Sequence, residues 1–203
     1  MINKKAKIAV LVSGGGTNLQ ALIDAEKKGI IKHGTITLVI SNNENAYALE
    51  RAKKADINTA VITVKSSGSR DAFEDCLINT LKEADIDLIV LAGFMSILSA
   101  KFTKTFENRI INVHPSLIPS FCGKGFYGLK VHEAALEYGV KVTGATVHFV
   151  NEIPDGGKII EQKAVKINKN DTPETLQLRV MKNAEWIILP RAVEKVSKEI
   201  VSK

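Results

Sequence analysis

Short apolar runs alternate with longer amphipathic segments over the first half of the chain. The runs with the composition of buried strands are residues 7–12, 35–41, 59–64, 87–93 and 110–114. The segments between them have helical periodicity, and the predicted helices are residues 17–29, 46–55, 69–84 and 98–109. Strands that are apolar at nearly every position, with helices between them, indicate a mostly parallel sheet covered on both faces.

Proline residues end this alternation after the fifth apolar run. Pro115 and Pro119 do not allow a helix to follow at once, so the next helix is predicted near residues 129–139. Residues 142–150 and 157–167 then have the pattern of two strands joined by NEIPDGG, as in a hairpin.

A long helical stretch closes the chain. It is predicted to begin at Pro173, with Asp171 or Thr172 as its N-cap. Pro190 lies in the middle of this stretch and is expected to kink or split the helix, because proline has no backbone N–H to donate.

Length and composition fit one domain. The chain has 203 residues, of which 45% are hydrophobic, and this is enough apolar material for a single core. The expected fold class is α/β. We expect one Rossmann-like domain over residues 1–203, with helices on both faces of a mostly parallel sheet and a C-terminal antiparallel extension.

Charge and cysteine content narrow the class of protein. The formal net charge is +6, but the basic residues form no stripe interleaved with aromatics, so nucleic-acid binding is not expected. A mildly basic surface suits a small anionic substrate. Cys76 and Cys122 match no metal-ligand spacing and favour a reducing compartment. With no apolar run long enough for a signal peptide or a membrane span, a cytoplasmic protein is expected.

A glycine-rich turn, SGGGTNLQ, joins the first predicted strand to the first helix. In open parallel sheets this position binds ligands, and residues 14–16 allow the backbone to approach an anion that the N–H groups of Thr17 and Asn18 then face. Leu19 stands where a dinucleotide fingerprint needs glycine, and no lysine follows as in a P-loop. A phosphate monoester pocket is the functional interpretation. A plain connecting turn is the alternative.

Polar side chains follow the fifth apolar run, in INVHP. Asn112 and His114 end that strand, and Asp155 lies on the turn between the last two strands, from which it can reach the same sheet edge. An amide, an imidazole and a carboxylate are suited to stabilising an oxyanion and moving protons. Asp155 is expected to raise the pKa of His114 above its free value of about 6.5. A purely structural role for these residues is the alternative, and His148, in mid-strand, is interpreted as a bracing residue.

No activated nucleophile accompanies these polar groups. The sequence has no G-x-S-x-G motif, and neither cysteine has an activating context. This favours direct transfer between two bound substrates over a covalent enzyme intermediate.

Five stretches, in this order, resemble the folate-dependent phosphoribosylglycinamide formyltransferase family: LVSGGGTNLQALID, LAGFMSILS, NVHPSLIPSF, GATVHFV and DGGKII. The resemblance covers about residues 7–192. It implies transfer of the formyl group of 10-formyltetrahydrofolate to the amine of glycinamide ribonucleotide, in purine biosynthesis, without a metal ion. The implied partners are small molecules alone, and the implied state is a monomer or a homodimer.

The resemblance also implies a role for each matching residue. Asn112, His114 and Asp155 match the catalytic residues of the family, with protonated His114 and Asn112 stabilising the oxyanion. The matching ribonucleotide-binding residues are Gly16, Thr17, Asn18 and Glu185, and the matching folate-binding residues are Arg70, Met95, Ser96, Ile97, Leu98 and Asn112. Trp186 departs from the family, which often has histidine after that glutamate.

Three other functions stay open at this point. Methionyl-tRNA formyltransferase shares the catalytic residues but normally has a further C-terminal domain. Formyltetrahydrofolate hydrolase usually has an additional N-terminal domain. Given 203 residues and a first strand near residue 7, neither is preferred. A non-catalytic module that binds a phosphoribosyl ligand is the third alternative.

Overall fold

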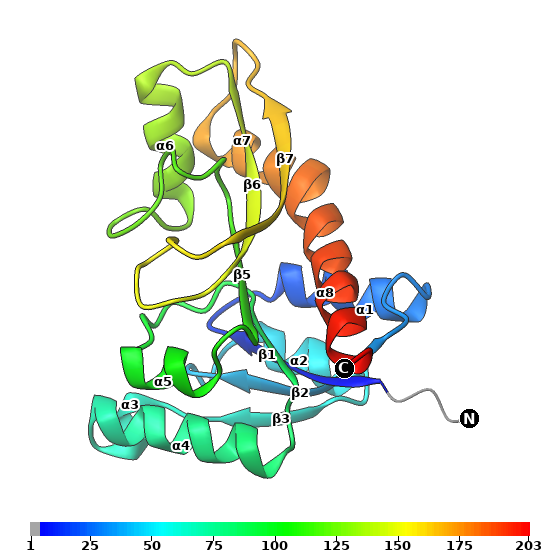
Figure 1. The fold of residues 1–203 in the computed structure, drawn as a ribbon. Coiled ribbons are helices and arrows are strands. Elements are labelled where there is room, and N and C mark those ends of the chain that lie inside the picture. The colour runs from blue at the N-terminus through cyan, green and yellow to red at the C-terminus, as the bar shows by residue number, and fades with distance from the viewer. Residues whose placement is uncertain (1–4) are drawn as a thin grey trace.

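The computed structural model describes residues 5–203, and its centre is a single seven-stranded sheet in the order β3-β2-β1-β4-β5-β6-β7 (Figure 1). The strands are β1 (Ala6–Val12), β2 (Gly34–Ser41), β3 (Asn58–Val61), β4 (Leu88–Leu91), β5 (Ile110–His114), β6 (Val142–Phe149) and β7 (Ile159–Lys166). Neighbouring strands from β3 to β5 are parallel, whereas β6 runs antiparallel to β5 and β7 antiparallel to β6. The predicted fold class is confirmed.

Helices cover both faces of the parallel part of the sheet. One face packs against α1 (Thr17–Lys27), α2 (Tyr47–Lys54) and α8 (Trp186–Val201), and the other packs against α4 (Arg70–Glu83) and α5 (Ala100–Thr105). In β1 the side chains alternate between the faces: Ile8 and Val10 lie in the first core cluster, and Ala9 and Leu11 in the second. Burial on both faces explains why this strand is apolar almost throughout.

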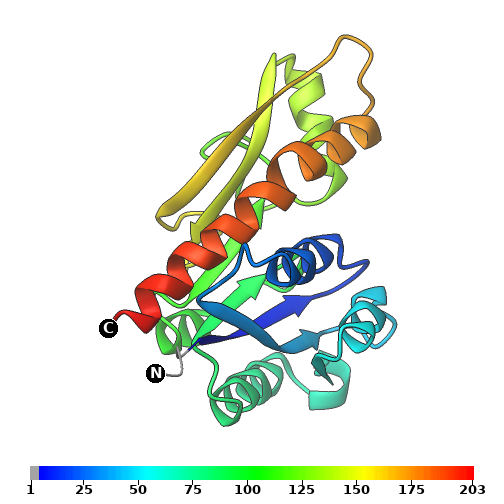
Figure 2. The same cartoon turned by 90° about the vertical axis from the view of Figure 1, so that its right-hand side faces the viewer.

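The antiparallel strands extend the molecule beyond the parallel layers (Figure 2). The short α3 (Val64–Ser67) precedes α4, while α6 (Leu129–Tyr138) packs against α7 (Pro173–Val180) beside β6. The long α8 crosses from this extension to the parallel part of the sheet (Figure 2). No helix within residues 5–203 is long and apolar enough to span a bilayer.

The C-terminal helical stretch differs in one respect from its prediction. Thr172 is the N-cap, and its hydroxyl accepts a hydrogen bond from the N–H of Thr175. Pro190 does not split the helix, because α8 continues through this proline. The irregular turn is instead a π-helix over Met181–Glu185, which ends where α8 begins at Trp186. In a regular α-helix the N–H of residue 190 would donate a hydrogen bond to the carbonyl of Trp186. Because proline has no N–H, that bond is missing at the first residue of α8, where the π-helix ends.

Candidate active site

The predicted site residues gather at the carboxyl edge of the parallel strands. The chain runs from β1 outward to β3 on one side and from β4 to β5 on the other, so the strand order reverses between β1 and β4. In open α/β sheets a ligand crevice forms outside the strand ends at such a switch point. The glycine turn follows β1, residues 94–98 follow β4, and Asn112 and His114 end β5.

Two of the candidate catalytic residues share one face of β5. Because side chains alternate along a strand, Asn112 and His114 lie on the face opposite to Ile111 and Val113, which belong to the core under α1 and α8. In the antiparallel ladder Asn112 is paired with His148 of β6, and the Asn112 Nδ2 atom lies 3.2 Å from His148 Nε2. The strand pairing therefore brings a second imidazole to the site.

Asp155 reaches the same group from the loop between β6 and β7. Its carboxylate lies 3.5 Å from His114 Nδ1 and 3.5 Å from His148 Nε2, and it accepts a 2.8 Å hydrogen bond from the N–H of Gly123. Asp155 has a φ of +56°, a conformation that Asp and Asn tolerate better than most residues. Gly157 fixes the next part of the turn, since a Cβ there would lie 1.7 Å from the carbonyl oxygen of Phe149.

His148 lies where a bracing residue is expected. It contacts both Asn112 and Asp155 and is almost completely buried. Its Nδ1 atom lies 2.8 Å from the carbonyl oxygen of Phe149, and donation there leaves Nε2 to face the two candidate catalytic groups. The sequence does not show that these two strands are neighbours or in which register they pair, so this contact appears only in the structure.

The environment of His114 corrects one prediction. Burial lowers the pKa of His114 below its ordinary value of 6.5, and His148 acts in the same direction, while Asp155 and a hydrogen bond to the carbonyl oxygen of Phe121 oppose the shift only in part. The expectation of a raised His114 pKa is therefore wrong for the protein without substrates. Burial also disfavours ionised Asp155, but the neighbouring His148 and His114 and the N–H of Gly123 outweigh it, so the pKa of Asp155 is lowered.

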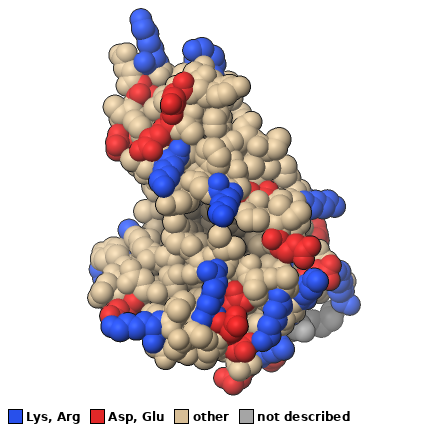
Figure 3. Space-filling model, turned by 90° about the vertical axis from the view of Figure 1, so that its left-hand side faces the viewer, with Lys and Arg blue, Asp and Glu red and all other residues tan. Residues whose placement is uncertain are grey.

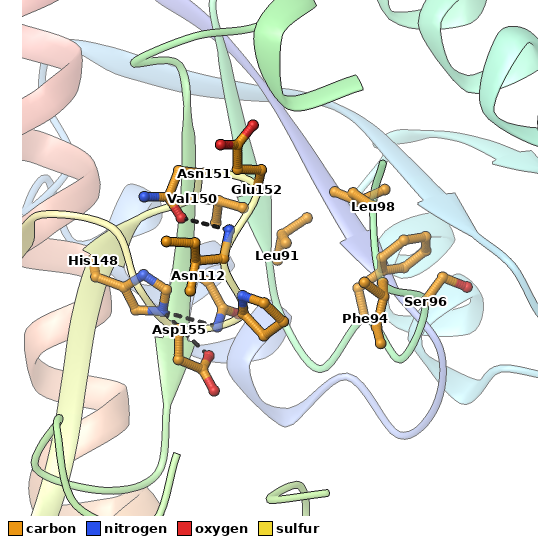
Figure 4. A pocket seen from close by; sticks show the side chains of 13 residues that line it. Leu91, Phe94, Ser96, Leu98, Asn112, His148, Val150, Asn151, Glu152 and Asp155 are labelled. Atoms are coloured by element: carbon orange, nitrogen blue, oxygen red, sulfur yellow. Dashed lines mark hydrogen bonds and ion pairs between the residues drawn. The ribbon is translucent and has the colours of Figure 1, made fainter. Parts of the chain in front are cut away.

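An apolar pocket opens beside this polar cluster. It has a volume of about 130 Å³, and Figure 4 shows Asn112, His148 and Asp155 together on one side, Phe94 and Leu98 across from them, and Leu91 between. Ser96 and Ile97 also line it, together with residues 150–154 of the β6–β7 loop. An apolar slot with a polar end suits a flat ring system that has a polar edge. Four of the predicted folate-binding residues, Ser96, Ile97, Leu98 and Asn112, line this one pocket.

Two predicted folate-binding residues stand outside this lining. The Met95 side chain is 56% exposed, and the N–H of Met95 donates a 2.9 Å hydrogen bond to the hydroxyl of Ser13, next to the glycine turn. Arg70 donates a hydrogen bond to the carbonyl oxygen of Ile97. Both therefore hold the segment that forms the pocket wall.

The face that carries α5 and α6 is hollowed near its middle, and Lys and Arg side chains border the hollow (Figure 3).

The glycine turn and Glu185 form a second group. Gly16 has a φ of +70°, and a Cβ there would lie 2.6 Å from the Cβ of Ala48 in α2, so the turn needs glycine at this position. Thr17 begins α1, and the Asn18 Nδ2 atom donates a 2.7 Å hydrogen bond to Glu185 Oε2. These residues come together although 167 positions separate Asn18 from Glu185.

The carboxyl of Glu185 is buried at the end of the π-helix. Burial raises its pKa from 4.5 to about 7, and the hydrogen bond from Asn18 limits the rise. A carboxyl with such a pKa is poised to ionise when a cationic or proton-donating ligand group arrives. π-Helical turns often occur at functional sites, and this one ends at the residue that faces the glycine turn.

We expect the free energy of unfolding to depend on pH through Glu185. The native state favours the protonated carboxyl, so its contribution is fully present below pH 4.5 and is lost as the pH rises toward 7. The loss amounts to about 3 kcal/mol. Glu185→Gln keeps the shape and cannot ionise, so it should gain stability relative to the wild type between pH 5 and pH 8. Urea unfolding of both proteins at the two pH values tests this, and parallel pH dependences would contradict the burial effect.

Within residues 5–203, no group of three or more His, Cys, Asp or Glu side chains is arranged to hold a metal ion.

Comparison with known proteins identifies the kind of domain. Residues 6–193 match the family model described as formyl transferase. A phosphoribosylglycinamide formyltransferase of Haemophilus influenzae is 44% identical over 188 residues, which cover 93% of this chain and 85% of that protein. The chicken trifunctional purine biosynthetic protein adenosine-3 is 48% identical over 193 residues, and this chain spans only 18% of its length.

Solved structures agree with these sequence relatives. The crystal structure of glycinamide ribonucleotide transformylase 1 from Symbiobacterium toebii has a TM-score of 0.89 and 40% sequence identity, over 96% of this chain and 89% of that one. A phosphoribosylglycinamide formyltransferase structure from Coxiella burnetii has a TM-score of 0.86 and 43% identity, over 98% and 89% of the two chains.

Proposed function

The chain belongs to the formyl transferase family, and we propose that it transfers the formyl group of 10-formyltetrahydrofolate to the amine of phosphoribosylglycinamide. The products are phosphoribosyl-N-formylglycinamide and tetrahydrofolate, in purine biosynthesis. The observation that supports this most is the cluster at the polar end of the apolar pocket. There Asp155 lies next to both His114 and His148, and His148 lies next to Asn112.

The pocket residues are assigned to the folate. 10-Formyltetrahydrofolate supplies the formyl carbon, and its flat ring system fits between the apolar side chains of Leu91, Phe94, Leu98 and Val150. Arg70 supports the wall of this pocket by holding the carbonyl of Ile97. The formyl group then lies toward the polar end of the pocket, next to Asn112.

Asn112 and His114 act on the reacting carbonyl. As the amine nitrogen bonds to the formyl carbon, the carbonyl oxygen gains negative charge, and the amide N–H of Asn112 stabilises it without titrating. His114 donates the second hydrogen bond, exchanging its 2.8 Å contact with the Phe121 carbonyl for one to the oxyanion. Because burial favours neutral His114 beforehand, its positive charge develops only as it takes up, through water, the proton that the attacking amine releases, and Asp155 stabilises that charge.

The proton balance closes without a metal ion or a covalent enzyme intermediate. The attacking amine loses a proton as its bond to carbon forms, and the folate nitrogen gains one as its bond to carbon breaks. His114 and water lie on this route, with the Asp155 carboxylate holding the imidazole.

The ribonucleotide is assigned to the glycine turn and Glu185. The N–H groups of Gly16, Thr17 and Asn18 face the phosphate at the start of α1. Glu185, held by Asn18, accepts a hydrogen bond from the glycinamide amine, whose cationic form would bring the carboxyl to its ionised state. Trp186 occupies the neighbouring position in α8 and has no assigned contact.

Turnover with both substrates tests the proposed function. Purified protein with phosphoribosylglycinamide and 10-formyltetrahydrofolate is expected to release tetrahydrofolate at a rate that depends on the amine. Release of equal rate without the amine would favour a hydrolase. The absence of any release, together with intact ribonucleotide binding, would favour a non-catalytic binding module.

We expect a side chain at Gly15 to weaken ribonucleotide binding selectively. A Cβ at Gly15 meets no protein atom within 4 Å, so Gly15→Val should preserve the fold and fill the space in front of the N–H groups. Calorimetric titration should then show weaker ribonucleotide binding and unchanged folate binding. Gly16→Val is the matched comparison, since its Cβ collides with Ala48 and should also lower the melting temperature. Equal loss of both ligands in Gly15→Val would contradict the assignment.

A further inference from the structure

We propose that Arg51, on α2, is a positioning residue for the glycine turn, and that its positive charge, on the protein side of the turn, offsets part of the charge of the phosphate monoester. The proposal rests on the proposed function, because it assumes that the turn receives the phosphate. Sequence patterns did not point to Arg51, which lies in the middle of the amphipathic segment AYALERAKKA. The structure places it against the turn, 36 positions away along the chain.

Every carbonyl of the turn is held from the protein side. The Ser13 oxygen accepts from Asn43 Nδ2 at 3.2 Å and the Gly14 oxygen from the N–H of Ala48 at 3.0 Å. The Gly15 oxygen accepts from Arg51 Nε at 2.8 Å, and the Gly16 oxygen from the N–H of Gln20 at 2.9 Å. Arg51 is the one charged side chain among these donors.

Because the peptide bond is planar, holding these carbonyls also orients the N–H groups that could bind an anion. In a trans peptide the N–H of one residue points opposite to the carbonyl of the residue before it. By holding the Gly15 carbonyl, Arg51 therefore directs the N–H of Gly16 outward, and Ala48 does the same for the N–H of Gly15. None of the N–H groups of Gly14, Gly15 and Gly16 donates to another group of residues 5–203. They are left to face a ligand.

Arg51 itself is held in place on several sides. Its guanidinium lies 5.0 Å from the centre of the Tyr47 ring, and Nη1 donates to Gln20 Oε1 at 3.1 Å. A Cβ on Gly16 would lie 3.4 Å from Arg51 Cδ, so the side chain runs directly beside the turn. Ordering the guanidinium before the ligand arrives reduces the entropy lost on binding.

The charge of Arg51 is not neutralised by a direct partner. Among the described residues no carboxylate forms an ion pair with it, and the acid reached through the network is Asp24, which accepts from Gln20 Nε2. Arg51 also lines, together with Thr17, Trp186 and the same Asp24, a cavity of about 150 Å³ at the start of α1. A phosphate monoester carries a charge of about −1.5 to −2 at pH 7. Neutral N–H groups alone leave that charge uncompensated, and arginine is well suited to offset it.

The test compares three variants in ligand binding. Arg51→Met removes the charge and the hydrogen bond to Gly15, and Arg51→Lys keeps the charge without the planar fork. Lys54→Met is the matched control, because Lys54 belongs to the same helix and lies 5.9 Å from the same Tyr47 ring. The dissociation constants of phosphoribosylglycinamide, of inorganic phosphate and of 10-formyltetrahydrofolate are measured separately, with kcat and KM for each substrate.

Arg51→Met is expected to weaken phosphoribosylglycinamide binding about 10- to 100-fold, because the variant loses both the positive charge beside the turn and the hydrogen bond that orders the Gly15 peptide. Binding of inorganic phosphate should weaken in parallel, and the dissociation constant of 10-formyltetrahydrofolate should change less than about twofold. For the ribonucleotide, kcat should fall less than kcat/KM. Arg51→Lys should recover only part of the affinity, and Lys54→Met should match the wild type.

Four results would overturn the inference. They are unchanged ribonucleotide binding in Arg51→Met, equal weakening of both substrates, full recovery in Arg51→Lys, and an effect of Lys54→Met as large as that of Arg51→Met. Failure of the wild type to bind the ribonucleotide would overturn the proposed function instead, so the two failures are distinguishable.

Discussion

Replacement of His114 or Asn112 by Ala is expected to lower kcat by about 100- to 1,000-fold and to change the dissociation constants of both substrates only a few-fold. Each side chain offers a hydrogen bond to charge that appears mainly in the transition state, so its loss raises the barrier more than it weakens binding. Asn112 is held toward the polar cluster by His148, and His114 lies next to Asp155, so both donors are ordered before the reaction. Single-turnover kinetics with saturating substrates measures the chemical step directly.

A control histidine separates catalysis from a general effect of mutation. His33 directly precedes β2, at the edge of the sheet opposite to the site, and its Nδ1 atom lies 2.6 Å from Glu194 Oε1. His33→Ala should alter the melting temperature and leave kcat close to that of the wild type. Near-normal turnover in His114→Ala would instead make the strand-end histidine a structural residue, as the alternative interpretation of the sequence holds.

Asp155→Asn is expected to lower kcat about 100-fold and to shift the titration of His114 to lower pH. Burial already lowers the pKa of His114, and the Asp155 carboxylate is the main group opposing that shift. Removal of its charge should lower the pKa further and make the cationic imidazole harder to form as the oxyanion develops. An imidazolium contributes below its pKa and is lost as the pH rises, so any high-pH limb that His114 causes should move to lower pH.

The asparagine variant preserves the shape of the turn. Asp155 has a positive φ of 56°, which asparagine also adopts readily, so a loss of activity cannot be assigned to a strained backbone. NMR titration of His114, the pH–rate profile and the melting temperature are measured on the same samples. A lower melting temperature with an unshifted His114 titration would mean that Asp155 only shapes the loop.

The sequence alone determined the layers of the fold and part of the site. Near-continuous apolar runs, with β1 as the first, specify strands buried on both faces, because each such position must lie against a helix on one side or the other. The place of Asn112 and His114 followed from the same pattern, since polar residues at the end of a buried strand lie at the sheet edge. The predicted folate-binding residues and the predicted role of Glu185 came from the resemblance of short motifs.

Only the tertiary structure decided how these residues act. Whether His148 faces Asn112 depends on strand register, and whether Arg51 holds the Gly15 carbonyl depends on how α2 packs against the turn. The pKa values of His114 and Glu185 follow from burial. The physical reason is how far apart along the chain the interacting residues lie. Hydrophobic periodicity acts between neighbouring residues and is written in the sequence, whereas desolvation and hydrogen bonding depend on groups that packing brings together from distant parts of the chain.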